Sequence, residues 1–267
     1  MSLVIRVPLA VESMNAVAGF YTEGPSLMAL FGFISQLELD AKFKVNRFGL
    51  VIEDYAARLS AKLTTSMDLA KRGDQSAGKR SEVSYRYADL RAALYLEIED
   101  DLGPDLPYLL EDIEAAINRL RVQGGALAEY VSANPDAPYG LQVATVQDDS
   151  DLVAFVSKNE NALSILYLSK HLSRELSGEQ LVEAYAEELL NRSTLMACHG
   201  YFIVGSVFDV SGAARQVGEP SYTLVEAFPV HRLKKLSPAE VSAKLGRFFW
   251  SFDAANYAEN PHQLFLI

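Results

Sequence analysis

The order of strand-like and helix-like patterns in the first 130 residues constrains the fold of this chain more than any other feature of its sequence. Strands show alternating apolar residues or runs of Val, Ile and aromatic residues, whereas helices place apolar residues three and four positions apart. These patterns predict a strand at 2–9, a helix at 27–39, strands at 45–55 and 92–98, a helix at 106–120 and a strand at 121–130. This order predicts an α+β fold with a ferredoxin-like core, the topology of the common RNA-recognition module.

The second half of the chain has a different character. The polar stretch 132–136 follows the last predicted core strand, so we expect a ferredoxin-like domain at 1–133 and a second, partly helical region at 134–267. Within the second region the patterns predict extended chain at 141–156, helices at 161–172 and 177–195, strands at 201–210 and 221–228, and a helix at 238–249. We interpret residues 157–197 as a helical insertion in a mostly β region.

Charge divides the sequence into segments of opposite sign. The 267 residues carry a formal net charge of −11, which argues against a free nucleic-acid-binding protein, because phosphate contacts require Lys and Arg. Residues 42–91 nevertheless contain eleven basic and six acidic residues, whereas residues 92–130 contain two basic and nine acidic ones. This distribution indicates either solvated faces or a basic surface on an acidic body, which would suit a nucleic-acid strand held inside an assembly.

Several function classes find no support in the sequence. A single cysteine, Cys198, excludes an internal disulfide framework and a cysteine-rich zinc site. There is no apolar run of 18 residues and no signal-peptide pattern, so we expect a cytoplasmic protein without a membrane span. The four histidines form no metal-binding pattern, and no nucleophile or phosphate-loop motif is present. We therefore expect a non-catalytic protein without a metal or cofactor.

Three short segments carry groups that bind phosphate or stack on bases: Gly78-Lys79-Arg80, Tyr85-Arg86-Tyr87 and Arg121 to Gly125. Cations neutralise phosphates, tyrosine rings stack on bases, and paired glycines let a backbone approach a phosphate closely. Each segment also has a structural interpretation. Lys–Arg pairs are commonly solvated, and paired glycines in a strand often mark a bulge.

The same segments, together with the start of the chain, resemble the Cas-five family of RAMP proteins. The densest match lies between residues 11 and 33 and includes Asn15-Ala16, Pro25-Ser26 and Gly32-Phe33. Further matches are Ala77 to Arg80, Arg121 to Gly125, and Leu224 to Glu226 with Trp250 downstream. Within the family, the chain is similar to the second Csy subunit of type I-F CRISPR surveillance complexes.

The resemblance implies a non-catalytic subunit that caps the five-prime handle of a CRISPR RNA. Such a subunit contacts the backbone Cas subunits and a large subunit, and it meets target DNA through the complex, where base pairing reads the sequence. With the phosphate-binding features above, it places the RNA contacts at seven residues. These are Asn15, Lys79, Arg80, Arg86, Arg121, Gly124 and Gly125.

Three alternatives remain open at this point. In a compact variant without a separate large subunit, this chain would itself contact the DNA that bears the protospacer-adjacent motif. The block at 157–197 would then be the segment that makes this contact. In a second alternative the chain is a CRISPR RNA-processing endonuclease, because His231 with Arg232, Lys234 and Lys235 could polarise an RNA hydroxyl. A third alternative is a purely structural interaction protein.

Overall fold

The computed structural model describes residues 2–15, 25–59, 63–64, 82–83, 86–98, 105–170, 178–191, 193–210, 213–260 and 263–267. The strands are β1 (Ser2–Asn15), β2 (Val45–Leu59), β3 (Leu63–Thr64), β4 (Glu82–Val83), β5 (Arg86–Ile98), β6 (Arg121–Val122), β7 (Gly125–Leu127), β8 (Gln142–Val146), β9 (Ile165–Ser169), β10 (Thr194–Val210), β11 (Ala213–Pro229), β12 (Phe249–Trp250) and β13 (Gln263–Phe265). The helices are α1 (Leu27–Ala41), α3 (Leu106–Ile117), α4 (Asp149–Asn159), α5 (Gly178–Leu189), the 3-10 helix η2 (Val230–Lys235), α6 (Pro238–Leu245) and α7 (Ala254–Glu259). This mixture of helix and antiparallel sheet confirms the predicted α+β class.

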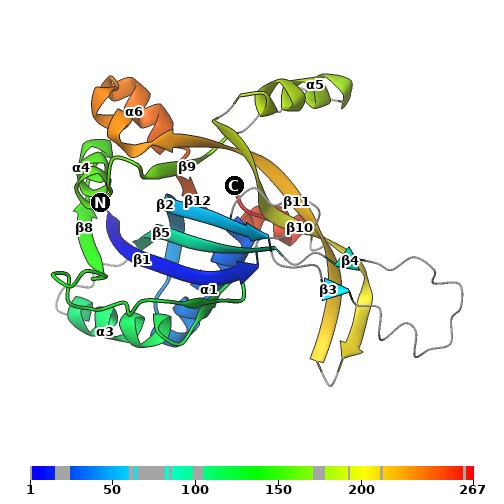
Figure 1. Cartoon of the computed structure of the whole chain (residues 1–267), viewed down its shortest axis with the longest axis horizontal. Helices are drawn as coiled ribbons and strands as arrows, with labels where there is room; N and C mark the ends of the chain where they lie inside the picture. The colour runs from blue at the N-terminus through cyan, green and yellow to red at the C-terminus, as the bar shows by residue number, and fades with distance from the viewer. Residues whose placement is uncertain are drawn as a thin grey trace, which may run out of the picture.

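One large sheet organises the described chain (Figure 1). Its eleven strands follow the order β13-β10-β11-β9-β2-β5-β1-β7-β6, with β12 also beside β2 and β8 also beside β1. The middle of this order, β7-β1-β5-β2, is antiparallel at every step. The first strand of the chain therefore lies in the interior of the sheet, where it pairs with β5 along one edge and with β7 and β8 along the other.

Both faces of the central strands carry apolar side chains, because residues along a strand point alternately to opposite sides. Ile5, Val7 and Leu9 of β1 join one apolar cluster with buried residues of α1 and α3. Val4 joins a second cluster on the opposite face, formed with residues of α4, η2 and α6. The two long helices α1 and α3 therefore cover one face of the central strands together.

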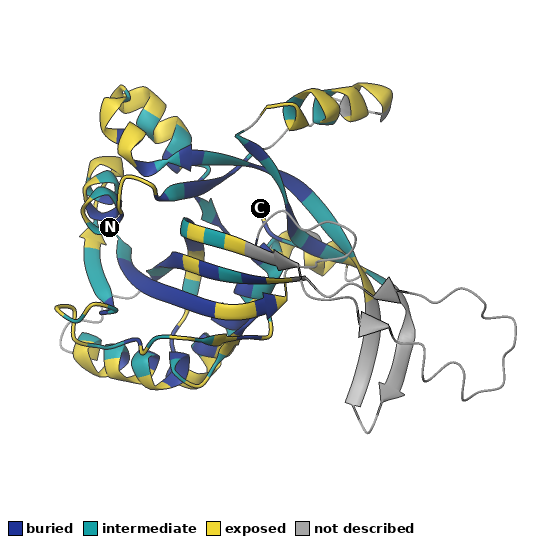
Figure 2. Ribbon diagram, viewed as in Figure 1, coloured by how far each residue is buried: buried dark blue, intermediate teal, exposed yellow. Residues whose placement is uncertain are grey.

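The opposite face is covered unevenly. The second apolar cluster includes Val4 near the start of β1 and Tyr95 near the end of β5, where α4 packs over them. Farther along, Glu12 of β1 and Arg91 of β5 are exposed (Figure 2). On the other side of the molecule, β10 packs against α1, so the sheet curves round the helix layer. Among the residues that the structure describes, the same central strands thus have a closed end and an open end.

Helix α4 corrects the prediction of extended chain through residues 141–156. Only Gln142–Val146 is a strand, and a helix begins at Asp149. The carboxylate of Asp148 accepts hydrogen bonds from the N–H groups of Ser150 and Asp151, at 2.8 and 3.1 Å, which satisfies two donors of the first turn. The acidic stretch here is therefore a helix cap.

Strand β9 corrects the predicted helix at 161–172. Residues 165–169 pair with β11 over their whole length and with β2 at Ile165 and Leu166. The segment is a short run of buried apolar residues, and such runs cannot be assigned to helix or strand from periodicity alone. The block at 157–197 therefore contains the end of α4, strand β9 and helix α5. None of the helices in the described ranges is both long and apolar enough to cross a membrane.

Candidate nucleic-acid interface

Four of the seven predicted RNA-binding residues meet at the open end of β1. Asn15 is the last residue of that strand, and the hairpin β6–β7, which contains Arg121, Gly124 and Gly125, pairs with β1 through Val11 and Glu12. The N–H of Asn15 donates to the backbone oxygen of Gln123 at 2.9 Å. The fold therefore brings together residues that are far apart in the sequence.

Gln123, which the sequence did not single out, holds this corner together. Its side-chain amide donates to the backbone oxygen of Asn15, across 108 residues of sequence. Its side-chain oxygen accepts from the N–H of Ser26, at 3.1 Å, across 97 residues. One side chain thus connects the end of β1, the start of α1 and the β6–β7 turn. A glutamine gives no local sequence signal for such long-range bonds.

Glycine is required at positions 124 and 125 of the turn for two different structural reasons. Gly124 has a φ of +80° and open space around its missing side chain, so its requirement is conformational. Gly125 is buried, and a Cβ there would lie 2.8 Å from the backbone oxygen of Glu12 and 2.8 Å from the Cα of Met14. The predicted close approach at Gly125 is thus an approach to strand β1, whereas Gly124 presents its backbone to solvent.

Arg121 supplies the positive charge at this corner. Its side chain is exposed, and one guanidinium nitrogen donates to the backbone oxygen of Gly124 at 3.4 Å. The charged group therefore lies over the turn. A planar guanidinium held in this way presents its remaining N–H groups to a ligand in a geometry that suits phosphate.

The start of α1 adds a second group that favours anions. Ser26 caps the helix by accepting from the N–H of Ala29 at 3.2 Å, and the first turn contains no acidic residue. The N-terminus of a helix carries a partial positive charge. Because Ser26 also bonds to Gln123, this helix end lies beside the turn and Arg121.

The remaining predicted RNA contacts are placed only in part. Arg86 begins β5, where its backbone pairs with Leu59 of β2, and the next residue, Tyr87, pairs with Asn15. The backbone of Arg86 therefore enters the sheet at the same corner. Lys79 and Arg80 lie outside the described residues.

The open face of the sheet next to this corner is acidic. Glu12, Asp54, Asp89 and Glu129 line a hollow of about 290 Å³ with a single basic residue, Arg91. The guanidinium of Arg91 donates to Glu129 at 2.8 Å and to the hydroxyl of Tyr139 at 2.7 Å. Carboxylates repel phosphates, so a nucleic-acid strand is favoured at the corner and disfavoured across this face.

A buried group of charges occupies the closed end. Arg6 of β1 donates to Glu160 at 2.8 Å, and the hydroxyl of Tyr95 donates to the same carboxylate oxygen at 2.8 Å. All three side chains are nearly inaccessible to solvent. Burial raises the pKa of the Glu160 carboxyl, although Arg6 and Tyr95 act in the opposite direction. Glu160 follows the last residue of α4, so this group fastens α4 to the sheet.

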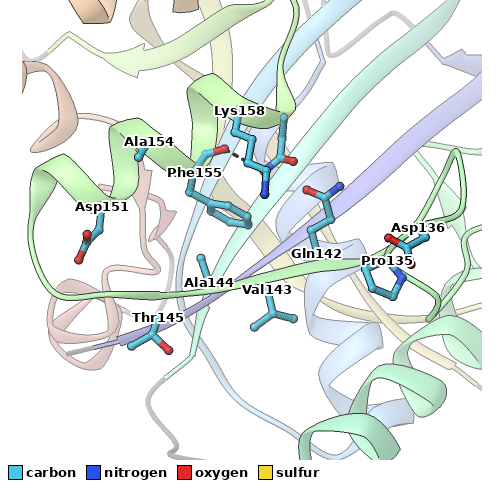
Figure 3. Close-up of a pocket in the computed structure, with 11 residues that line it drawn as sticks. Pro135, Asp136, Gln142, Val143, Ala144, Thr145, Asp151, Ala154, Phe155 and Lys158 are labelled. Atoms are coloured by element: carbon cyan, nitrogen blue, oxygen red, sulfur yellow. Dashed lines mark hydrogen bonds between the residues drawn. The ribbon is translucent and has the colours of Figure 1, made fainter.

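A larger hollow, of about 570 Å³, lies between β8 and α4 (Figure 3). Val143, Ala144 and Thr145 form one side of it, and Asp151 and Lys158 belong to the helix on the other. Its lining mixes apolar groups with charges of both signs, so it indicates no particular ligand. Among the described residues, no group of three or more His, Cys, Asp or Glu side chains is arranged to hold a metal ion.

His231, the predicted base of the endonuclease alternative, lies on η2. Its Nδ1 lies 2.9 Å from the backbone oxygen of Ala162, so that nitrogen carries a proton and donates. Residues of η2 pack into the cluster at the start of β1, whereas Asn15 ends that strand. The structure therefore places His231 and the corner of Asn15 and Arg121 on different parts of the molecule.

Comparison with known proteins adds no assignment, since neither a protein-family model nor a curated protein sequence matches this chain. The likeness to the Cas-five family therefore stands on the short motifs alone.

Proposed function

We propose that this chain is a non-catalytic subunit of an RNA-guided CRISPR complex and that it holds the five-prime handle of the guide RNA at the end of β1. One observation carries the proposal: Asn15, Arg121 and Gly124, which match the family's motifs, lie together. Gln123 bonds to Asn15, and Arg121 donates to the backbone oxygen of Gly124. If these motif residues serve one RNA site, they must lie close together in space, as they do here.

The strand order supports a ferredoxin-like core as the framework of this site. In the split βαβ arrangement the third strand is inserted between the first two. Here β5 lies between β1 and β2, and β7 lies on the other side of β1. Helices α1 and α3 share one apolar cluster, as two helices on one face of such a sheet would.

The chemistry of the corner favours a phosphate backbone. The Arg121 guanidinium lies over an exposed turn, and the capped start of α1 lies beside it. The acidic hollow on the open face disfavours RNA lying flat across the sheet. The RNA would therefore pass the end of the strands, where Arg86 and Tyr87 of β5 lie beside Leu59 and Asn15. Holding backbone rather than reading bases is what a subunit needs where base pairing supplies sequence recognition.

The test is RNA retention and its salt dependence. The chain would be purified with its co-expressed neighbouring proteins, and the bound RNA sized and quantified. Substituting Arg121→Gln should weaken RNA binding and reduce the slope of log affinity against log salt by about 0.7, the value for one lost phosphate contact on a single strand. Lys79→Gln with Arg80→Gln should reduce the slope further, because the family motif also places phosphate contacts there.

Arg119→Gln is the matched control. It removes the same charge two residues away, but the Arg119 guanidinium donates to the backbone oxygen of Ala115 on α3 and not to the turn. Its effect on the slope should be small. An unchanged slope for Arg121→Gln, or purification without a discrete guide-length RNA, would contradict the proposal. Cleavage of precursor RNA that disappears with His231→Ala would instead establish the endonuclease alternative.

A further inference from the structure

Helix α5 stands away from the body of the molecule (Figure 1). It is joined to the body by an ion pair between Lys170 and Glu188 and by packing against β10. Most of its described residues are exposed (Figure 2). None of the described side chains of α5 belongs to either apolar cluster. The exposed surface of these described residues therefore requires another explanation.

The exposed surface of α5 includes an apolar stripe. Val182 is 68 % exposed, Leu189 is 41 % exposed, and Leu190, directly after the helix, is 85 % exposed. Tyr185, which is half-buried, lies between Val182 and Leu189. The three residues have the spacing i, i+3 and i+7, which places them along one side of a helix. Amphipathic helices that dock into a groove on another protein use anchors at this spacing.

The charges of α5 all have one sign. Its twelve residues include Glu179, Glu183, Glu187 and Glu188 and no Lys or Arg. Glu188 faces the body, where it pairs with Lys170. On a helical projection Glu179 and Glu183 border the apolar stripe on the side away from the body. The stripe is thus flanked by carboxylates.

We propose that α5 is a protein-docking helix that inserts Val182, Tyr185 and Leu189 into an apolar groove bordered by Lys and Arg on a different protein. Complementary charge across an interface orients the partners and selects among them. The carboxylates disfavour the other occupants: nucleic acid and anionic membrane surfaces are negative, and the α5 of a second copy would bring like charges together. The same charges count against a role of this block in contacting DNA.

The proposal rests on the proposed function in one respect, that the partner is another subunit of the same assembly. A photo-crosslinking residue at position 182 would identify it in the complex purified with its co-expressed neighbours. The control is the same residue at position 180, because Gln180 is exposed on nearly the opposite side of the helix. We expect position 182 to link to a different protein and position 180 to link to it weakly or not at all.

Matched charge insertions test the energetic contribution of the stripe. Val182→Glu and Gln180→Glu each add one carboxylate to an exposed position of the same helix. We expect Val182→Glu to lower the affinity for the linked subunit about tenfold or more, as loss of an interface anchor does, and Gln180→Glu to change it little. Glu179→Lys with Glu183→Lys, the two carboxylates that border the stripe, should weaken the same contact.

The outcomes separate this inference from the proposed function, because RNA is measured in the same preparations. Guide-length RNA retained with no link from position 182 would overturn the docking role and leave RNA binding intact. A link to another subunit without bound RNA would support the docking role and contradict RNA binding. A link to nucleic acid or to a second copy, or unchanged affinity in Val182→Glu, would overturn the docking role.

Discussion

The two ends of strand β1 use charge in opposite ways. At its start, Arg6 is buried beneath α4 and satisfied by Glu160, which also accepts from Tyr95. At its end, Glu12 and Asn15 are exposed, and the neighbouring charge, Arg121, lies over a turn in contact with solvent. Among the described residues, one end is covered by α4, whereas the other lies beside the β6–β7 turn and the start of α1.

This difference separates stability from recognition along a single strand. Charges at the closed end are removed from water and are compensated mainly by one another, so changing any one of them affects folding. Charges at the open end remain hydrated and available to a ligand, so changing one should affect binding more than folding. Substitutions at the two ends of β1 test this separation.

Substitution of Glu160 by Ala should destabilise the protein by about 3–5 kcal/mol, because it leaves a buried arginine without its partner. No described group donates to the second oxygen of this carboxylate, so the pair is not fully compensated even in the native protein. Urea denaturation at pH 7 measures the effect.

The control for this prediction replaces the whole group. Arg6→Met, Tyr95→Phe and Glu160→Leu together should recover most of the lost stability, since apolar side chains of similar size leave no charge unpaired. A triple variant no more stable than Glu160→Ala would mean that packing, and not the unpaired charge, dominates. RNA binding by the triple variant should be unchanged if the two ends are independent.

Gly125→Ala should be the most destabilising small change at the open end, by about 2–3 kcal/mol, because its Cβ would overlap the backbone of β1. Gly124→Ala meets no atom and should lose about 1 kcal/mol through its left-handed backbone alone. Gly124→Asn should recover much of that loss, since Asn tolerates this conformation. Thermal unfolding measures all three, and equal losses for the two alanine variants would contradict the distinction.

Gln123→Ala should reduce stability by about 2 kcal/mol, because each of two lost hydrogen bonds has a usual net value of about 1 kcal/mol, and it should also weaken RNA binding. The variant loses both side-chain bonds but keeps the backbone bond from Asn15. Hydrogen exchange at the Ser26 amide should accelerate about five- to tenfold, because its acceptor is gone.

A double-mutant cycle with Arg121→Gln distinguishes positioning from general destabilisation. If Gln123 acts by fixing the corner where Arg121 binds phosphate, the two losses in RNA affinity should be less than additive, whereas their losses in stability should add. Additive affinity losses would assign Gln123 a structural role alone.

The order of the first six elements was accessible from the sequence because each has a strong period of its own. Helices α1 and α3, for example, lie close to their predicted ranges, whereas strand β5 begins at Arg86, six residues before the predicted strand at 92–98. The second half was harder. Residues 142–146 alternate like a strand. The main sequence signal for the helix that follows is the N-cap residue Asp148. The short apolar strand β9 has no period that distinguishes it from a helix.

The corner itself could be predicted only through its motifs. The motifs predict Asn15 and Arg121 as RNA contacts, but not that the two residues lie close together. Their proximity depends on the pairing of β1 with β7, which no local pattern encodes. Gln123 was missed because its role consists of bonds to Asn15 and Ser26, both distant in sequence. The burial of Gly125 against β1 follows from the same pairing.

The smallest predicted effect concerns an ion pair at the margin of the closed end. Arg47 donates to both carboxylate oxygens of Glu97, at 2.6 and 3.0 Å, but its own side chain is half exposed. Burial alone would raise the pKa of Glu97, yet the bonds from Arg47 outweigh it and hold the pKa below the ordinary 4.5.

A carboxyl with a lowered pKa contributes stability at pH values above its ordinary pKa. It loses that contribution as the pH falls through the folded pKa. Wild type should therefore exceed Glu97→Gln in stability by about 0.5 kcal/mol at pH 7, because solvent screens the exposed guanidinium, and the gap should close below about pH 4. A gap that persists in acid would show that the glutamine is poorly accommodated, and that the charge itself contributes nothing at this position.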